Sequence, residues 1–478
     1  MADHKKFYIN GEWVEPKDGT DFHVIDPSTE ETFETISLGG QADTDAAVAA
    51  AKQAFHQWRK ASKAERLELL ESIYEIYLKR SDEMGAVISR EMGAPIDMSK
   101  MQQSGAGSGH IKAFIHALKN FEFERELREN TPNDRIIYEP IGVCALITPW
   151  NWPMNQISLK VIPAIATGCT MVLKPSEQSP LSAMLFTEIL HEAGVPAGVY
   201  NLVNGDGMGV GSQLSNHKDV DMVSFTGSTR AGRAISIAGA ETIKRISLEL
   251  GGKGANIVFA DAQEKAIKHG IIRCFNNTGQ SCNAPTRMLV ERPRYEQAVE
   301  EAKAAAEATS VNSASAEGRH IGPLVSEIQF NKVQDLIQQG IDEGARLVAG
   351  GVGRPEGLNR GFFVRPTVFA DCTNDMTVMR EEIFGPVLSM MPFDSEDEAI
   401  AIANDTEYGL TNYIQTSDPE KARRVARELR SGMVDINGQA RSSGSPFGGM
   451  KQSGNGREGG VWGIEEFLEV KAVGGWPD

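Results

Sequence analysis

The spacing of hydrophobic positions changes along the chain. Segments 43–60 and 62–80 carry apolar residues at helical spacing behind residues that can cap a helix, which predicts two amphipathic helices. From about residue 136, short runs rich in β-branched residues predict strands at 141–148, 170–173, 199–203, 222–225 and 257–259. Helix-length segments lie between these strands, at about 155–167, 181–193, 208–216 and 228–240.

The alternation resumes after residue 285. A strand is predicted at 286–290 and a long helix at 294–309, followed by further elements at 330–343, 347–349 and 399–404. Strand–helix alternation at this spacing is typical of a parallel sheet with helices on both faces. One sheet would have to be very large, so we expect two α/β domains joined near residues 250–280. The chain shows no internal repeat.

Composition and charge exclude several kinds of partner. The 478 residues suffice for two or three domains, and 48 Lys+Arg against 65 Asp+Glu give a net charge of −17. An acidic surface repels nucleic-acid phosphates and anionic lipids, so neither is an expected partner. No stretch reaches the ~18 apolar residues of a membrane span, and no apolar signal-peptide core follows Met1. Five cysteines are too sparse for a disulfide framework, which favours the cytoplasm.

Cys282 differs from the other cysteines in its neighbours. It lies in Gly-Gln-Ser-Cys-Asn, a polar turn, whereas Cys144 and Cys274 have the apolar neighbours of core residues. An exposed thiol is a liability unless it is used. The turn therefore leaves two interpretations open for Cys282, a small buried residue or a reactive nucleophile.

Two further polar residues stand at places where chemistry is feasible. Glu249 lies between two leucines and directly before Gly-Gly, so it is either an exposed strand-end residue or a partly desolvated general base. Asn151 lies in a rigid Pro-Trp-Asn-Trp-Pro turn. Its side chain either forms the turn or donates an N–H to a developing oxyanion.

Two strand ends are candidate ligand sites. Lys174 and Glu177 follow a strand at the edge where parallel sheets bind ligands, and they can meet phosphate or ribose oxygens or form an ordinary solvated pair. Gly227 and Ser228 follow the next strand but one and precede a helix, which gives either an anion site or a plain helix cap.

Seven motifs together resemble one family. They are PWNWP (149–153), LKPSE (173–177), FTGST (225–229), LELGGK (248–253), GQSC (279–282), EEIFGPV (381–387) and PFGGMKQSGNGRE (446–458). In order and spacing they resemble the NAD(P)-dependent aldehyde dehydrogenase superfamily over essentially the whole chain. A literal G-x-G-x-x-G at 454–459 belongs to the last motif, because no strand-to-helix unit frames it.

The resemblance implies an α/β fold with three parts. A Rossmann-like NAD-binding domain is expected from 1–120 and 141–250, and a catalytic α/β domain from 251–455. A small β oligomerisation element is expected from 121–140 and 456–478, with strand-like segments at 122–127 and 131–137. A homodimer or a homotetramer is implied.

The resemblance also implies roles for individual residues. Cys282 resembles the nucleophile, Glu249 the base for the hydrolytic water, and Asn151 with the Cys282 N–H the oxyanion hole. Lys160 and Glu458 match a proton path to the base. Positions that match cofactor contacts are Thr148, Trp150, Lys174, Ser176, Glu177, Gly207, Phe225, Gly227, Ser228, Leu250, Glu382 and Phe384. No metal ion is expected.

The substrate itself is not predicted. The expected pocket includes Trp150, Met154, Ser281, Asn283, Arg441 and Phe447. Relatives acting on simple apolar aldehydes often carry an aromatic residue near 441. Arg441 therefore either binds a carboxylate or polar group of the substrate, or points to solvent or into a subunit contact. Arg287 occupies a common family position and says nothing about selectivity. Glu177 would repel the extra phosphate of NADP, so NAD is favoured.

The expected reaction is oxidation of an aldehyde to a carboxylic acid through a thiohemiacetal and a thioester on Cys282. Retention of Glu249 favours hydrolysis over transfer to coenzyme A. The alternative within catalysis is a cysteine-dependent hydrolase or acyl transferase with a distant histidine as base. A binding protein that has lost activity is disfavoured, because both nucleophile and base are present.

Overall fold

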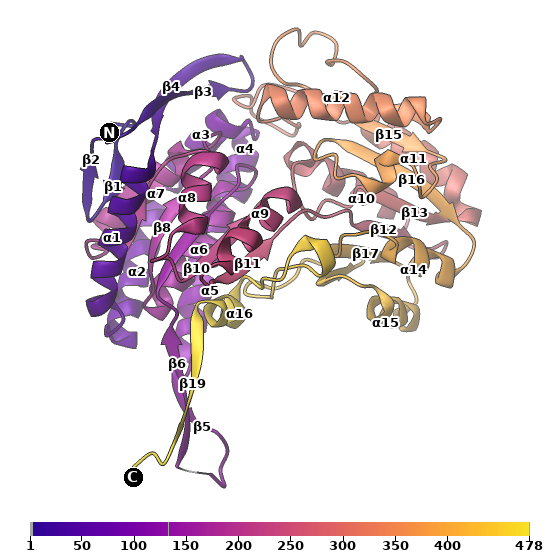
Figure 1. Ribbon diagram of the computed structural model, residues 1–478. Helices are drawn as coiled ribbons and strands as arrows, with labels where there is room; N and C mark the ends of the chain where they lie inside the picture. Colours follow the sequence, from indigo (N-terminus) through magenta and orange to yellow (C-terminus); the bar gives the residue numbers. More distant parts are fainter. Residues whose placement is uncertain (1–2, 132, 478) are drawn as a thin grey trace.

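The computed structural model describes residues 3–131 and 133–477. Pro132, within the predicted strand 131–137, and residues 1, 2 and 478 lie outside the described residues. Figure 1 shows two bodies, each built around a sheet, and a narrow β arm that extends away from them.

The first body contains a seven-stranded sheet in the order β11-β10-β7-β8-β9-β1-β2. The strands are β1 (Phe7–Ile9), β2 (Glu12–Val14), β7 (Val143–Ile147), β8 (Thr170–Lys174), β9 (Tyr200–Leu202), β10 (Met222–Thr226) and β11 (Arg245–Glu249). The run from β11 to β9 is parallel, as predicted, and β1 pairs antiparallel with both β9 and β2. The β1–β2 hairpin was not predicted, because strands of three residues are too short to show an alternating pattern.

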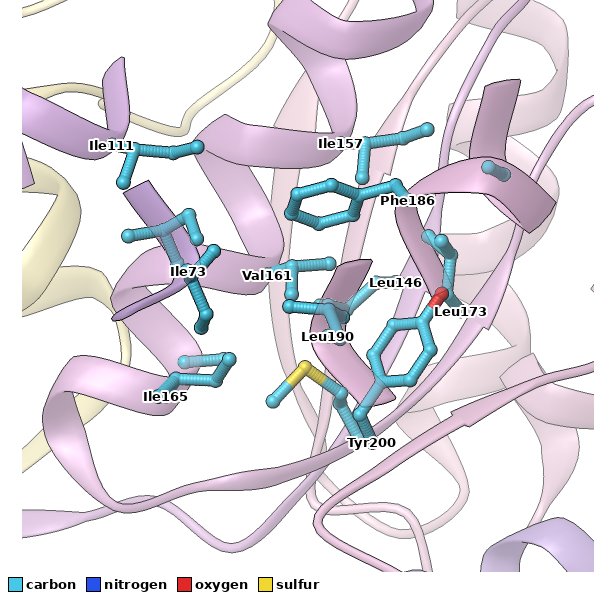
Figure 2. Packing of buried hydrophobic residues seen from close by; sticks show 14 of the residues in the cluster. Ile73, Ile111, Leu146, Ile157, Val161, Ile165, Leu173, Phe186, Leu190 and Tyr200 are labelled. Carbon is cyan, nitrogen blue, oxygen red and sulfur yellow. The ribbon is translucent and has the colours of Figure 1, made fainter. Parts of the chain in front are cut away.

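Helices cover both faces of this sheet. One face carries α2 (Lys63–Lys79), α3 (Ser81–Met92), α5 (Gly105–Asn120), α6 (Pro153–Thr167), α7 (Leu181–Glu192) and α16 (Gly460–Glu466), and the other carries α1 (Gln41–Trp58), α8 (Ser212–Asn216) and α9 (Thr229–Ala240). Along β7, Leu146 belongs to the first core and Ala145 to the second, because successive strand residues point to opposite faces. Figure 2 shows Leu146 with Val161 of α6 and Phe186 of α7 in the first core.

The second body repeats this construction in the order β14-β15-β16-β13-β12-β17-β18. Its strands are β12 (Ala255–Val258), β13 (Arg287–Glu291), β14 (Arg346–Ala349), β15 (Thr367–Ala370), β16 (Val387–Phe393), β17 (Thr411–Gln415) and β18 (Met433–Ile436). Only β14 is antiparallel among the described strands of this sheet. Helices α10 (Ala266–Phe275) and α11 (Tyr295–Glu307) cover one face, and α12 (Glu327–Asp342), α13 (Thr377–Arg380), α14 (Glu396–Asn404) and α15 (Pro419–Glu428) cover the other.

The arm is a three-stranded antiparallel sheet in the order β19-β6-β5. It consists of β5 (Glu124–Glu126), β6 (Asp134–Pro140) and β19 (Leu468–Gly474). β19 pairs with β6 from Leu468 opposite Pro140 to Gly474 opposite Asp134, so the C-terminal segment is joined to a strand far away in the sequence. A separate hairpin, β3 (Thr20–Asp26) with β4 (Glu31–Leu38), completes the sheets. The proposed domain boundaries stay predictions.

Candidate active site

A pocket of about 210 Å³ lies where the two bodies meet. It is lined by Pro149, Trp150, Asn151, Gln156, Thr226, Gly227, Ser228, Leu250, Gly251, Cys282, Gln329, Lys332, Glu382 and Phe384. The first body contributes the loops at the carboxyl ends of β7, β10 and β11, the edge at which parallel α/β sheets bind ligands. The second body contributes Cys282, Glu382 and Phe384, so candidate nucleophile and candidate cofactor loops meet in one cavity.

The loop before Cys282 has an unusual backbone. Asn277, Thr278 and Gly279 all have positive φ, at 53°, 58° and 72°. A β-branched residue such as Thr278 rarely adopts this conformation, which surrounding contacts must enforce. Thr278 Oγ1 donates to the Gly322 carbonyl at 3.1 Å, and a Cβ on Gly279 would lie 2.0 Å from the carbonyl oxygen of Gly385. Glycine at 279 therefore permits close approach of the segment that carries Glu382 and Phe384.

Buried amides connect this loop to Asn151. The Asn151 carbonyl accepts from Gln103 Nε2 at 3.0 Å and from Asn277 Nδ2 at 2.8 Å. The Asn151 side chain donates in turn to the Gln280 carbonyl at 3.1 Å. Gln103 lies on the π-helix η1 (Ser99–Ser104) and is fully buried, and no sequence motif pointed to it. This network fixes the candidate oxyanion donor relative to the loop of the candidate nucleophile.

Glu249, at the end of β11, is buried rather than exposed. The residue is 2% exposed, and neither carboxylate oxygen has a hydrogen-bond partner among the described residues. A Cβ on Gly448 would lie 2.7 Å from Glu249 Oε1, so glycine in the PFGG motif leaves room for the carboxylate. Burial, and then the negative charge of Glu458, raises the pKa of Glu249 well above its usual range, against the opposing effect of Lys160.

Lys160 and Glu458 form a buried ion pair. Lys160 Nζ lies 2.6 Å from Glu458 Oε1 and also donates to Ser224 Oγ at 3.1 Å. The side chains are 1% and 6% exposed, and Glu458 Oε2 has no hydrogen-bond partner in the described chain. Two residues almost 300 positions apart in the sequence are thus brought together beside Glu249.

The surroundings of Cys282 are negative. Burial raises the pKa of its thiol, and the carboxylates of Glu382, Glu249 and Glu458 raise it further. A backbone N–H acts in the opposite direction. The resting thiol is therefore protonated at neutral pH, and a proton has to leave before sulfur can attack.

The predicted adenosine side of the pocket begins at the end of β8. Lys174 Nζ lies 3.5 Å from Glu177 Oε2, and burial lowers the pKa of Lys174 while Glu177 opposes this shift. Ser228 caps α9 by accepting from the Ala231 N–H at 3.3 Å. Ser176 Oγ accepts from the Gln178 N–H at 3.2 Å. The buried side-chain oxygens of Thr148, Thr226 and Gln156 have no hydrogen-bond partner among the described residues.

Gly207 starts a π-helix, η2 (Gly207–Gly211), that continues into α8. The predicted helix 208–216 is therefore present, but its first turn is wider than α. Phe225 is 7% exposed, and its ring covers Gly227, where a Cβ would lie 2.4 Å from the ring. A side chain at 227 would collide with this ring.

The 381–387 segment closes the opposite side. Glu382 Oε1 accepts from the Gly252 N–H at 2.9 Å, and a Cβ on Gly251 would lie 2.6 Å from Glu382 Oε2. Phe384 and Trp150 meet edge to face, with ring centroids 5.4 Å apart. Gln329 and Lys332 donate to the carbonyls of Phe384 and Glu382, at 2.9 Å and 2.8 Å. Nothing in the sequence pattern pointed to these two residues, since both resemble ordinary polar residues of a surface helix.

Of the predicted substrate residues, Trp150 lines the pocket, and Ser281 and Asn283 are the sequence neighbours of Cys282. Trp152 Nε1 donates to Ser281 Oγ at 2.8 Å, a contact that sequence reasoning missed. The Asn283 carbonyl accepts from the Tyr413 hydroxyl. Met154 is fully buried and packs in the core of the first body. The guanidinium of Arg441 lies 5.7 Å from the ring centroid of Phe447.

Over 3–131 and 133–477, no group of three or more His, Cys, Asp or Glu side chains is placed to hold a metal ion. Within the same ranges, no helix is long and apolar enough to cross a membrane.

The fold and the pocket define an α/β protein with a cysteine in a cavity at the carboxyl ends of its parallel strands, and comparisons with known proteins identify its family. The sequence profile of the aldehyde dehydrogenase family matches residues 13–473, and the chain belongs to this family. A 3-succinoylsemialdehyde-pyridine dehydrogenase from Pseudomonas sp is 51% identical over 100% of this chain and 99% of its own length.

Solved structures agree. An aldehyde dehydrogenase from Bartonella henselae is 59% identical, with a TM-score of 0.99 over 100% of both chains. A cysteine-to-alanine mutant of aldehyde dehydrogenase C from Pseudomonas syringae, solved with NAD+ and octanal, is 46% identical, with a TM-score of 0.97 over 99% of this chain and 97% of that one. The predicted family and fold class are confirmed.

Proposed function

We propose that this aldehyde dehydrogenase oxidises an aldehyde to a carboxylic acid with NAD, and that Cys282 holds the substrate covalently. The observation that carries the proposal is the convergence of Cys282 and Asn151 on one pocket, with the buried Glu249 carboxylate beside them. The NAD+ complex of the Pseudomonas syringae relative supports the cofactor. No histidine is among the lining residues of this pocket in the described chain, which counts against a hydrolase with a Cys–His pair.

The first stage makes hydride loss feasible. Cys282 releases its proton to solvent water, and its sulfur adds to the carbonyl carbon to form a tetrahedral thiohemiacetal with a negative oxygen. Asn151 Nδ2 and the Cys282 N–H are the proposed donors to that oxygen, and loss of one such donor costs ~3–4 kcal/mol in the barrier. Collapse of the oxyanion expels hydride from the same carbon and leaves a thioester on Cys282. When bound, NAD supplies the hydride acceptor.

The second stage releases the acid. Glu249 takes a proton from water, and the water oxygen attacks the thioester carbon. The C–S bond then breaks, the carboxylic acid leaves, and sulfur departs as the thiolate. Lys160 and Glu458 are proposed to carry the proton away from Glu249, because they form a buried ion pair next to it.

The proposed cofactor site fits the residues present. Lys174 and Glu177 would hold the adenosine ribose, and Glu177 would repel the additional phosphate of NADP. Gly227 and Ser228 would lie along the pyrophosphate at the start of α9, where N–H groups favour anions. Glu382 would hold the nicotinamide ribose. The other proposed contacts are Thr148, Trp150, Ser176, Gly207, Phe225, Leu250 and Phe384.

We further propose that the arm, β5, β6 and β19, pairs subunits, because it projects from the bodies and has exposed residues such as Val470 (63%). A homodimer or homotetramer is expected. Five unpaired cysteines support a reducing compartment, the cytoplasm.

The test is NADH absorbance with a panel of aldehydes that includes octanal and a pyridine-linked semialdehyde. Oxidation with NAD is expected, and Cys282→Ala should lower the rate at least ~10³-fold while NAD still binds by fluorescence quenching. An unchanged rate in Cys282→Ala would show that Cys282 is not the nucleophile. Absence of NADH over the whole panel, with acid released from activated esters, would favour a hydrolase.

A further inference from the structure

Two arginines share one buried carboxylate near the proposed active site. Asp435, on β18, is 2% exposed. Arg273 Nη2, from α10, contacts Asp435 Oδ2, and Arg441 Nε donates to Oδ1 at 3.0 Å. The arginine side chains are 34% and 27% exposed, so both remain accessible to a ligand. Two guanidinium groups against one carboxylate leave one positive charge in excess.

Both arginines are held in place yet keep free donors. Arg273 lies over the Tyr413 ring at 4.4 Å, and Arg441 lies over the Phe447 ring at 5.7 Å. Within the described residues, no acceptor is found for Nε and Nη1 of Arg273 or for Nη2 of Arg441. Donors that the protein has already oriented bind an anion with a smaller loss of entropy than free side chains would.

The aromatic rings connect this arginine pair to the proposed catalytic residues. The Tyr413 hydroxyl donates to the carbonyl of Asn283, the residue directly after Cys282. The Phe447 N–H donates at 2.8 Å to the carbonyl of Glu458, whose side chain binds Lys160. The arginine pair is therefore attached to the proposed active site through both its aromatic neighbours.

An anionic substrate needs such a positive group here. Burial and then three carboxylates, those of Glu382, Glu249 and Glu458, raise the pKa of the Cys282 thiol. The same carboxylates repel an anion that approaches the sulfur. The excess positive charge at Arg273 and Arg441 offsets this repulsion at a fixed place beside the Cys282 loop.

We infer that Arg273 and Arg441 bind a carboxylate at the far end of the substrate, which makes the substrate class the semialdehydes of short dicarboxylic acids. This inference rests on the proposed aldehyde oxidation. The guanidinium groups bind the distal carboxylate through the free N–H groups, and the aldehyde end reaches Cys282. Asp435 positions the two arginines and does not touch the substrate.

The test compares two substrates that differ in charge alone, 4-oxobutanoate and its methyl ester. For the unmodified enzyme at low ionic strength, kcat/KM should favour the acid by at least ~10-fold, and added salt should reduce this preference. Arg441→Gln and Arg273→Gln should each lower the preference ~10-fold, because KM should rise more for the acid than for the ester. Arg441→Lys should retain part of the preference for the acid, because lysine keeps the positive charge. Each single variant leaves Asp435 one arginine partner, so its buried charge stays paired.

Arg360→Gln is the matched control, because Arg360 forms an exposed ion pair with Glu31. This substitution should leave kcat/KM unchanged for both the acid and the ester. Equal kcat/KM for acid and ester in the unmodified enzyme, or equal losses for both in the glutamine variants, overturns the inference while aldehyde oxidation stands. No NADH from either substrate or from neutral aldehydes would instead overturn the proposed function.

Discussion

At the scale of single residues, Glu249 combines burial with a lack of partners. Burying a residue to 2% exposure with no hydrogen bond to its carboxylate within the described chain costs folding free energy. Groups with such perturbed proton affinity cluster at functional sites. Glu249→Gln keeps the size and removes the base. We expect a burst of about one NADH per active site, then steady-state turnover lowered ~10²–10⁴-fold, because the thioester forms but hydrolyses slowly.

Stopped-flow absorbance at the NADH band measures both phases. The exposed Glu356→Gln is the matched control and should retain full turnover. Unimpaired steady-state turnover in Glu249→Gln would show that another group activates the water.

The pKa of the Cys282 thiol gives a second prediction at this scale. Since burial and nearby carboxylates raise this pKa, the neutral thiol persists above its ordinary range. The thiolate fraction, and with it the burst rate, should keep rising above about pH 9.5, where a thiol with the ordinary pKa of about 8.5 is already about 90% ionised. Glu249→Gln removes one of these negative charges, so its profile should move to lower pH. Burst rates that are flat from pH 6 to 9 would contradict the protonated resting thiol.

At the scale of elements, the loop before Cys282 depends on contacts between the 279 and 385 segments. Gly279→Ala places a Cβ at positive φ and 2.0 Å from a backbone oxygen, which cannot move aside as a flexible side chain can. We expect loss of at least ~10-fold in kcat and a lower apparent melting temperature. Gly109→Ala in α5 is the control, because no atom lies within 4 Å of its added Cβ and alanine favours a helix. Full activity in Gly279→Ala would mean that the loop tolerates another conformation.

Local signals located some elements well and others not at all. A helix over 62–80 with a capping residue at its start was predicted, and Ser62 does cap α2, with Glu65 accepting from the Ser62 N–H at 2.7 Å. In contrast, β17 (TNYIQ) was not predicted, since its polar Asn412 suggests a surface segment. Asn412 is in fact 4% exposed and accepts from the Ala255 N–H of β12 at 2.9 Å. A long-range partner, absent from the local pattern, makes that burial possible.

At the scale of the whole molecule, β19 of the arm is mostly exposed: Leu468 is buried, but residues 469–472 are exposed. If the arm pairs subunits, a charge at the exposed Val470 of β19 should weaken the assembly. Val470→Glu is expected to shift the mass toward the monomer by light scattering after size exclusion. Ile328→Glu on α12, 81% exposed, is the control and should leave the mass unchanged. An unchanged oligomer in Val470→Glu would place the interface elsewhere.

Local periodicity and ordered motifs were sufficient to predict the family, the parallel α/β sheets and the candidate residues Cys282, Glu249 and Asn151. Which distant groups meet became known from the folded structure. In the folded chain, Gln103 donates to the Asn151 carbonyl, and Lys160 pairs with Glu458. Arg441 and Arg273 both bind the carboxylate of Asp435. Such contacts depend on how separate elements pack, and burial and electrostatic interactions between segments leave no regular pattern along a single chain.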